Sequence, residues 1–208
     1  MIMDFEHWLA LFATCVALAV SPGPSSTYAL STSIRYGHRA GVRAVIGSAT
    51  GFASLIFIAL VGLTALVATL PWFILGLKIA GAIYLLWLAV SLWRHAKFHN
   101  EPATGINQWH NTKKQASTLV RGFLIAFSNP KVVLFWLAFI PSILLVEQLD
   151  AWDIVIVIAT FALVEAIAEL LLVWLGARAQ RYLQKHMALI DRLSAVIFTI
   201  FAMILLTT

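Results

Sequence analysis

Long apolar stretches alternate with short polar segments along this chain. About 20 helical residues cross the roughly 30 Å hydrocarbon core of a bilayer, and six stretches reach about that length. They are residues 5–34, 45–70, 72–93, 119–146, 154–177 and 189–206. The pattern predicts an all-α membrane protein with six transmembrane helices.

Two of these stretches contain residues that break an α-helix. Residues 21–26 (Ser-Pro-Gly-Pro-Ser-Ser) interrupt the first stretch, and residues 128–131 (Ser-Asn-Pro-Lys) interrupt the fourth. Proline lacks a backbone N–H and clashes with the preceding turn, so each helix must break there. Freed backbone groups are tolerated at this depth only where protein buries them or where they line a polar cavity. Broken spans in matching places of two halves indicate the site of a transporter.

The basic residues fall almost entirely between the apolar stretches. All of the 14 lysines and arginines except Lys78 and Lys131 lie in three segments, at 35–43, 94–121 and 178–192. The positive-inside rule places such segments in the cytoplasm. The sequence therefore predicts a multi-pass protein with both termini outside the cytoplasm.

Each predicted half contains three spans, an odd number, so the second half enters the membrane with the opposite orientation. This layout fits a 3+3 inverted repeat in which the first helix of each half is broken. Residues 1–96 form the first half and residues 118–208 the second. Residues 97–117 are polar and predict a flexible cytoplasmic linker.

Composition agrees with a membrane protein. Hydrophobic residues make up 62% of the chain and charged residues 11%, far from the soluble average. The net charge of +5 comes from basic residues that form no aromatic-studded patch, so we expect membrane lipids and no nucleic acid as partners. Cys15 is the only cysteine, which excludes an intrachain disulfide. The sequence leaves both a monomer and a homodimer open.

Three ionisable side chains lie near the middle of predicted spans: Lys131, Glu165 and Glu169. A charge at the bilayer centre costs at least about 2.5–3.5 kcal/mol, so such groups usually face a polar interior and pair. We expect Lys131 to pair with Glu165, and Glu169 follows one turn later on the same helix face. The alternative is that the pair only locks two helices together.

The residues after each break restart a helix, and the first N–H groups of a helix attract anions. These donors are expected at Ser25, Ser26, Lys131 and Val132. A zwitterionic solute could place its carboxylate on them and its ammonium near Glu165 or Glu169. The alternative is that both breaks are kinks that serve packing.

Two small-residue pairs, Gly47 with Gly51 and Gly76 with Ala80, have the spacing that permits close helix contact.

The sequence predicts no cofactor and no metal site. It contains no phosphate-binding loop, zinc signature or nucleophile elbow, and His95 and His99 have helical ligand spacing without a third ligand. Two alternatives to a transporter stay open. One is an intramembrane enzyme that uses Glu165 and Glu169 as an acid/base pair, and the other is a structural membrane subunit.

At these residues the chain resembles the LysE/RhtB family of amino-acid exporters, which includes lysine, homoserine and threonine efflux permeases. The similar segments are SPGPSSTYALSTSIRYGHRAGVRAVIGSATGF at 21–52, LKIAGAIYLLWLAVSLWR at 77–94, RGFLIAFSNPKVVLFWLAFIP at 121–141 and TFALVEAIAELLLVWLGARA at 160–179. The combination of Pro-Gly-Pro with Asn-Pro-Lys is specific, although either motif alone would be weak.

The resemblance implies a proton-coupled efflux transporter of a small amino acid or amino-acid derivative in the bacterial inner (plasma) membrane, and not an enzyme. Glu165 falls where many members have an acidic residue, and Glu169 has no counterpart. This chain has Ser25 where the family usually has Asn or Asp. The motif residues that carry over are Pro22, Gly23, Pro24, Asn129, Pro130 and Lys131.

Overall fold

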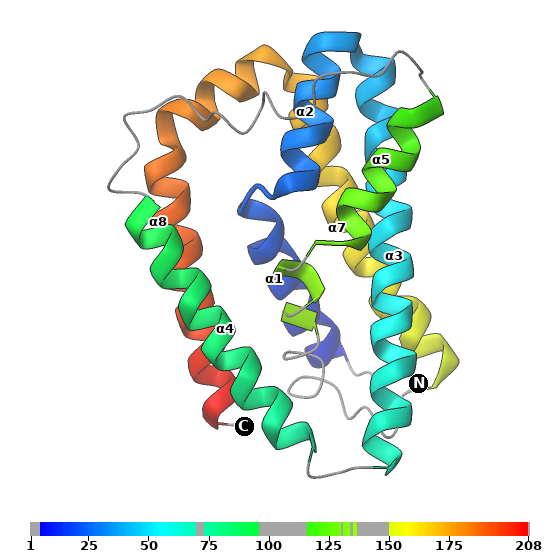
Figure 1. The fold of residues 1–208 in the computed structure, drawn as a ribbon, viewed down its shortest axis with the longest axis vertical. Helices are drawn as coiled ribbons and strands as arrows, with labels where there is room; N and C mark the ends of the chain where they lie inside the picture. The colour runs from blue at the N-terminus through cyan, green and yellow to red at the C-terminus, as the bar shows by residue number, and fades with distance from the viewer. Residues whose placement is uncertain are drawn as a thin grey trace.

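The structure is a computed structural model that describes residues 5–69, 73–95, 116–129, 131–133, 135–136 and 150–207. All regular structure in these ranges is helical, and they contain no strand. The helices, drawn in Figure 1, are α1 (Phe5–Val20), α2 (Pro24–Tyr36), α3 (His38–Thr69), α4 (Phe73–His95), α5 (Ala116–Phe127), α7 (Ala151–Leu175) and α8 (Ala177–Thr207).

Three of these helices are long and apolar enough to cross a membrane, in the windows His38–Gly62, Ala151–Leu175 and Lys185–Ile204. The pair α1 and α2 qualifies as a fourth span if the two helices are taken together. The all-helical membrane fold is therefore confirmed. The count of six spans and the inverted repeat stay predictions, because most of 128–149 and the whole of 96–115, which includes most of the predicted linker, lie outside the described residues.

Both predicted breaks are present. The α1 helix ends at Val20, Gly23 is extended, and α2 starts at Pro24 with its axis bent by 55°. Proline suits this first helical position because its missing N–H would have no partner there. In the second half α5 ends at Phe127, and helical conformation resumes at 131–133. Pro130 itself lies outside the described residues.

Glycines bring α3 and α5 into backbone contact. A Cβ atom added at Gly47 would collide with the carbonyl oxygen of Leu119, and one added at Gly122 would collide with that of Ala44. At Gly51 the added atom would lie 2.5 Å from the Phe123 carbonyl oxygen. The close contact predicted for Gly47 and Gly51 is thus confirmed, whereas no described atom lies within 4 Å of a Cβ added at Gly76.

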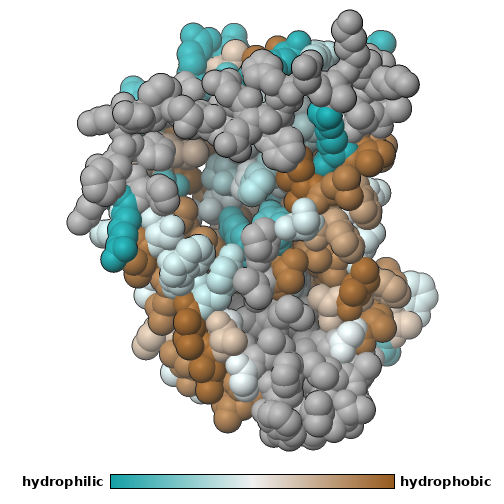
Figure 2. Space-filling model, viewed as in Figure 1, coloured by the Kyte–Doolittle hydropathy of each residue, from teal (hydrophilic) through white to brown (hydrophobic). Residues whose placement is uncertain are grey.

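The chain reverses direction at opposite ends of the molecule. Figure 1 shows the start of α1 and the end of α8 towards one end, and the α2–α3 and α7–α8 turns at the other. Exposed basic residues flank those turns, namely Arg35, Arg39, Arg43, Arg178 and Arg181. Figure 2 likewise shows hydrophilic residues at this upper end and hydrophobic residues along the flank. We call it the basic end; its cytoplasmic location stays a prediction.

The opposite end carries the cap of α7. Asp150 and Asp153 form a capping box, in which the Asp150 side chain accepts the Asp153 backbone N–H at 2.8 Å. This hydrogen bond holds the pKa of Asp150 below its ordinary value, because it favours the ionised carboxylate. The cap fixes where α7 begins, and therefore which α7 side chains reach the middle of the bundle.

We predict opposite effects for Gly47→Ala and Gly62→Ala, two identical changes in α3. Gly47→Ala should lower stability by about 1–3 kcal/mol, because the new methyl group meets the α5 backbone, which cannot move aside. Gly62→Ala should be neutral or stabilising, since no described atom is near it and alanine favours a helix by roughly 0.5–1 kcal/mol over glycine. Thermal unfolding of the two purified variants in detergent measures this. Equal midpoints would show that the α3–α5 contact is looser than described.

Candidate functional site

A small polar cavity lies where the two helix breaks meet. Its volume is about 10 Å³, room for roughly one water molecule, so this conformation is closed around the site. The residues that line it are Leu18, Ser21, Gly23, Ser25, Ser26, Phe52, Asn129, Lys131, Val132 and Glu165. Most of the predicted site residues therefore converge, while Pro22, Pro24 and Glu169 are not in the lining.

Lys131 ties the second break to the first. Its Nζ donates to the carbonyl oxygen of Ser21 at 2.9 Å, across 110 positions of sequence, and to that of Leu18 at 3.5 Å. The last carbonyl groups of a helix lack their usual partners within the helix. Here the Leu18 carbonyl accepts the Ser21 N–H at 3.3 Å, and the ammonium is a further partner for it and a partner for the Ser21 carbonyl. The same Nζ lies 5.3 Å from the centre of the Phe198 ring in α8, a cation–π distance.

Glu165 shares the cavity with Lys131 but does not form the predicted direct pair. The two groups interact electrostatically, yet the structure places no ion-pair contact between these two described residues. In this conformation the expected pair is thus an electrostatic one without direct contact, because the ammonium donates to the carbonyl oxygens of Ser21 and Leu18. The Glu165 carboxyl group is thus left facing the cavity, and its side chain is only 6% exposed.

Glu169 lies one turn along α7 and faces other partners. Ser48 of α3 donates to its Oε2 at 2.8 Å, and the Ser25 side chain at the start of α2 also interacts with it. The other oxygen, Oε1, is buried and has no hydrogen-bond partner among the described residues. Glu169 therefore joins α7 to α2 and α3 and keeps an unused acceptor.

The two helix starts differ in how their N–H groups are satisfied. At α2 the N-cap is Gly23, and no side chain caps the helix, although Ser25 and Ser26 line the cavity. At the second start Asn129 Oδ1 accepts the Lys131 N–H at 3.1 Å, and the Asn129 carbonyl accepts that of Val132 at 3.2 Å. The expectation of free N–H groups at Lys131 and Val132 is therefore wrong, because both donate to Asn129, which caps this helix.

Gly23 of the first break also lies close to Asn129 of the second. A Cβ atom added at Gly23 would lie 3.7 Å from Asn129 Nδ2. The fold thus places the two helix breaks next to each other, and polar groups of both breaks face one cavity.

An aromatic cluster extends from Phe52, the one aromatic residue among the described residues that line the cavity. Phe161 lies one turn before Glu165, and its ring meets Phe52 of α3 edge-on at 5.4 Å and Trp136 edge-on at 5.2 Å. Such edge-to-face contacts between buried rings are favourable. Sequence reasoning missed Phe52 and Ser48, because a phenylalanine or serine within an apolar span carries no signal of its own.

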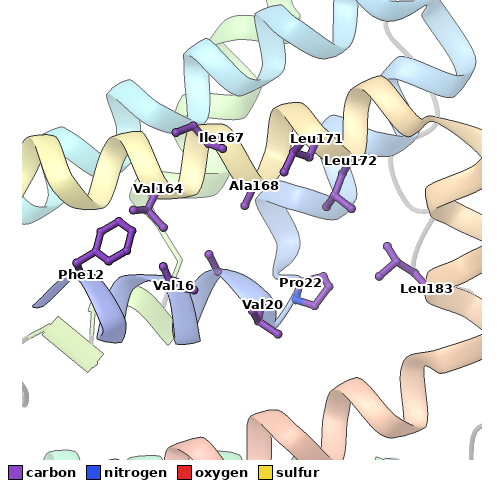
Figure 3. Close-up of a pocket in the computed structure, with 11 residues that line it drawn as sticks. Phe12, Val16, Val20, Pro22, Val164, Ile167, Ala168, Leu171, Leu172 and Leu183 are labelled. Carbon is purple, nitrogen blue, oxygen red and sulfur yellow. The ribbon is translucent and has the colours of Figure 1, made fainter. Parts of the chain in front are cut away.

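A larger apolar groove lies on the other side of the first break. Its volume is about 400 Å³, and it is lined by Phe12, Val16, Ala19, Val20, Pro22, Val164, Ile167, Ala168, Leu171, Leu172 and Leu183. Figure 3 shows side chains of α1 and α7 around this space, with Leu183 of α8 at its far side. We call it the α1/α7 groove. It contains no ionisable group and is not the polar site.

Charged and polar groups enclosed between broken membrane helices are typical of transporters. The chain belongs to the LysE type translocator family, whose profile matches residues 16–208. The predicted resemblance is thereby confirmed, and the protein is a translocator, not an enzyme.

Several relatives are similar over most of their length. An uncharacterized membrane protein of Vibrio cholerae is 31% identical over 183 residues, covering 88% of this chain and 86% of the relative. A homoserine/homoserine lactone efflux protein of Salmonella typhimurium is 32% identical, with 70% and 68% covered. A leucine efflux protein of Enterobacter sp. (strain 638) is 29% identical, with 80% and 78% covered. No solved structure matches the chain.

We predict that Ser48→Ala destabilises the protein by about 1–3 kcal/mol, because it removes a hydrogen-bond donor from the buried Glu169 carboxyl group. Ser54→Ala is the matched control on the same helix, since its hydroxyl donates only to the Thr50 carbonyl of its own helix. Thermal unfolding of both variants checks the difference. In a Glu169→Leu background the Ser48→Ala effect should shrink towards zero; an undiminished effect would assign the loss to another contact.

Proposed function

We propose that this protein exports a small amino acid, or a close derivative of one, across the bacterial inner membrane in exchange for protons. The observation that carries the proposal is the meeting of both helix breaks, Lys131 and Glu165 around one enclosed cavity. Support also comes from the relatives named as homoserine/homoserine lactone and leucine efflux proteins.

The groups around the cavity suit a zwitterion. The uncapped start of α2 offers the N–H groups of Ser25 and Ser26 to a carboxylate, as helix N-termini do for anions. Lys131 can turn its ammonium from the α1 carbonyl oxygens to the same carboxylate. The ammonium of the substrate then faces Glu165, which has no direct ion pair with the lysine.

The closed cavity must widen before an amino acid fits, and the breaks are where the backbone can move. On one side Phe52 lines it, and the Phe52 ring packs against Phe161, which in turn packs against Trp136. Towards the basic end the links are polar, such as the Ser33 hydroxyl donating to the Val173 carbonyl at 3.1 Å. In alternating access one set of contacts opens while the other holds, so the site faces one side at a time.

Glu165 provides a route to proton coupling. An ionised carboxylate can hold the substrate ammonium, whereas a protonated carboxyl group cannot pair with it. A proton entering from outside would therefore release the substrate, and loss of that proton on the inside would restore the site. Glu169 lies one turn away and gives the proton a second carboxyl group within the protein.

The direct test is efflux from proteoliposomes that contain the purified protein and are preloaded with homoserine, leucine or lysine. At least one amino acid should leave faster than from protein-free liposomes, and an imposed pH gradient should accelerate it. Transport without any response to the gradient would overturn the proton coupling. If none of a wider amino-acid panel moves, the proposed substrate class is wrong.

We predict that Glu165→Gln lowers efflux roughly tenfold or more while the protein stays folded, because the substrate ammonium loses its charged partner. Asp150→Asn makes the same carboxylate-to-amide change at the start of α7, where asparagine caps a helix as well as aspartate does, and should leave efflux near wild type. Efflux and thermal unfolding are measured together. Wild-type efflux in a Lys131→Leu, Glu165→Leu double variant would show that transport needs neither charge and would overturn the proposed site.

A further inference from the structure

We propose that the α1/α7 groove binds one acyl chain of an anionic phospholipid, whose headgroup is attracted by the positive charge at the start of α8. All the side chains in the groove are apolar, and several face outward, with Val20 49%, Ile167 57% and Leu171 55% exposed. Water does not fill an apolar space of this kind. In a bilayer the surrounding apolar molecules are lipid tails, so an acyl chain is the occupant that the chemistry fits.

The length of the groove fits one leaflet. Its lining runs along α7 from Val164 to Leu172 and along α1 from Phe12 to Val20, about two helical turns in each case, which rise roughly 11 Å. One leaflet contributes about half of the roughly 30 Å hydrocarbon core. An acyl chain from the leaflet at the basic end can therefore lie along the whole groove.

The upper end of the groove has the features of a headgroup region. Trp174 and Tyr182 are 75% and 63% exposed there, as expected of aromatic residues at a membrane interface. Leu183 of α8 reaches the groove. At about 100° per residue, the exposed Arg178, Arg181 and Lys185 lie on the opposite face of this segment.

The start of α8 is thus amphipathic, apolar towards the groove and basic towards the headgroups. From that face the basic side chains attract anionic headgroups electrostatically, without contact with the groove itself. Charge complementarity therefore selects an anionic lipid over a zwitterionic one.

The site has a consequence for the first break. Pro22 lines the groove, while its neighbours Ser21 and Gly23 line the polar cavity. A lipid in the groove would contact the same turn of backbone that forms the transport site. Anionic lipid is therefore expected to raise the rate of efflux; this part rests on the proposed function, whereas lipid binding does not.

Native mass spectrometry of the full-length protein in detergent tests the binding. The protein is titrated with phosphatidylglycerol and with phosphatidylethanolamine of identical acyl chains. Leu171→Trp and Val20→Trp fill the groove from exposed positions, and Ile83→Trp, at a 64% exposed position of α4, is the matched control. Arg178→Gln, Arg181→Gln and Lys185→Gln are combined, with Arg35→Gln and Arg39→Gln as the control at the same end.

Wild type and both control variants should bind phosphatidylglycerol more tightly than phosphatidylethanolamine. The groove-filling variants should weaken phosphatidylglycerol binding about tenfold. The triple variant should bind the two lipids equally, because each basic residue replaced should weaken phosphatidylglycerol binding by about fivefold. Equal binding of the two lipids by wild type, or unchanged binding in both groove-filling variants, overturns the proposal. The proposal is also overturned if the groove-filling variants convert a dimer to a monomer and still bind the lipid. The groove would then be a contact between two copies of the chain.

Efflux is then measured in liposomes with and without phosphatidylglycerol. Lipid binding without amino-acid efflux would refute the proposed function and leave the lipid site standing. Efflux that is independent of phosphatidylglycerol, in a protein that binds it, would refute the link between the groove and the break.

Discussion

The structure depends on one constraint: backbone groups released inside a membrane must find partners within the protein. The Ser21 carbonyl lies just beyond the end of α1, and the Lys131 ammonium donates to it and to the Leu18 carbonyl. The helix restart after the second break is capped by Asn129. Each break is therefore stable only with polar residues beside it. The same polar and charged residues form the candidate site. A cavity with polar walls follows from the way in which the helices are interrupted.

The packing of the helices keeps the two breaks together. The α3 helix lies along α2, α5 and α7, and α4 lies along α8, so three of these four close pairs join the first half of the chain to the second. Glycines at 47 and 122 allow α3 and α5 to meet backbone to backbone. The halves do not form separate bodies, and the polar cavity lies between them.

Much of the site could be anticipated, but its connections could not. The breaks, the lysine and the glutamates were visible because prolines and charges are conspicuous in apolar stretches. The sequence could not show that Lys131 and Glu165 interact without direct contact, because the competing carbonyl oxygens of Leu18 and Ser21 have no signature in the sequence. The capping role of Asn129 was missed, although an asparagine before a helix start is a signal that could have found it. Ser48 and Phe52 were missed because their roles depend on partners in α7.

The sequence by itself determined where helices run, where two of them break, and which charges lie at mid-depth. These properties are local, because hydropathy, proline and glycine act on the backbone within a few residues. Only the tertiary structure decided that the breaks adjoin, that Lys131 reaches α1 rather than Glu165, that Glu169 faces Ser48, and that an apolar groove flanks Pro22. Those contacts join residues more than 100 positions apart, and they are selected by the packing of whole helices, which no short stretch of sequence encodes.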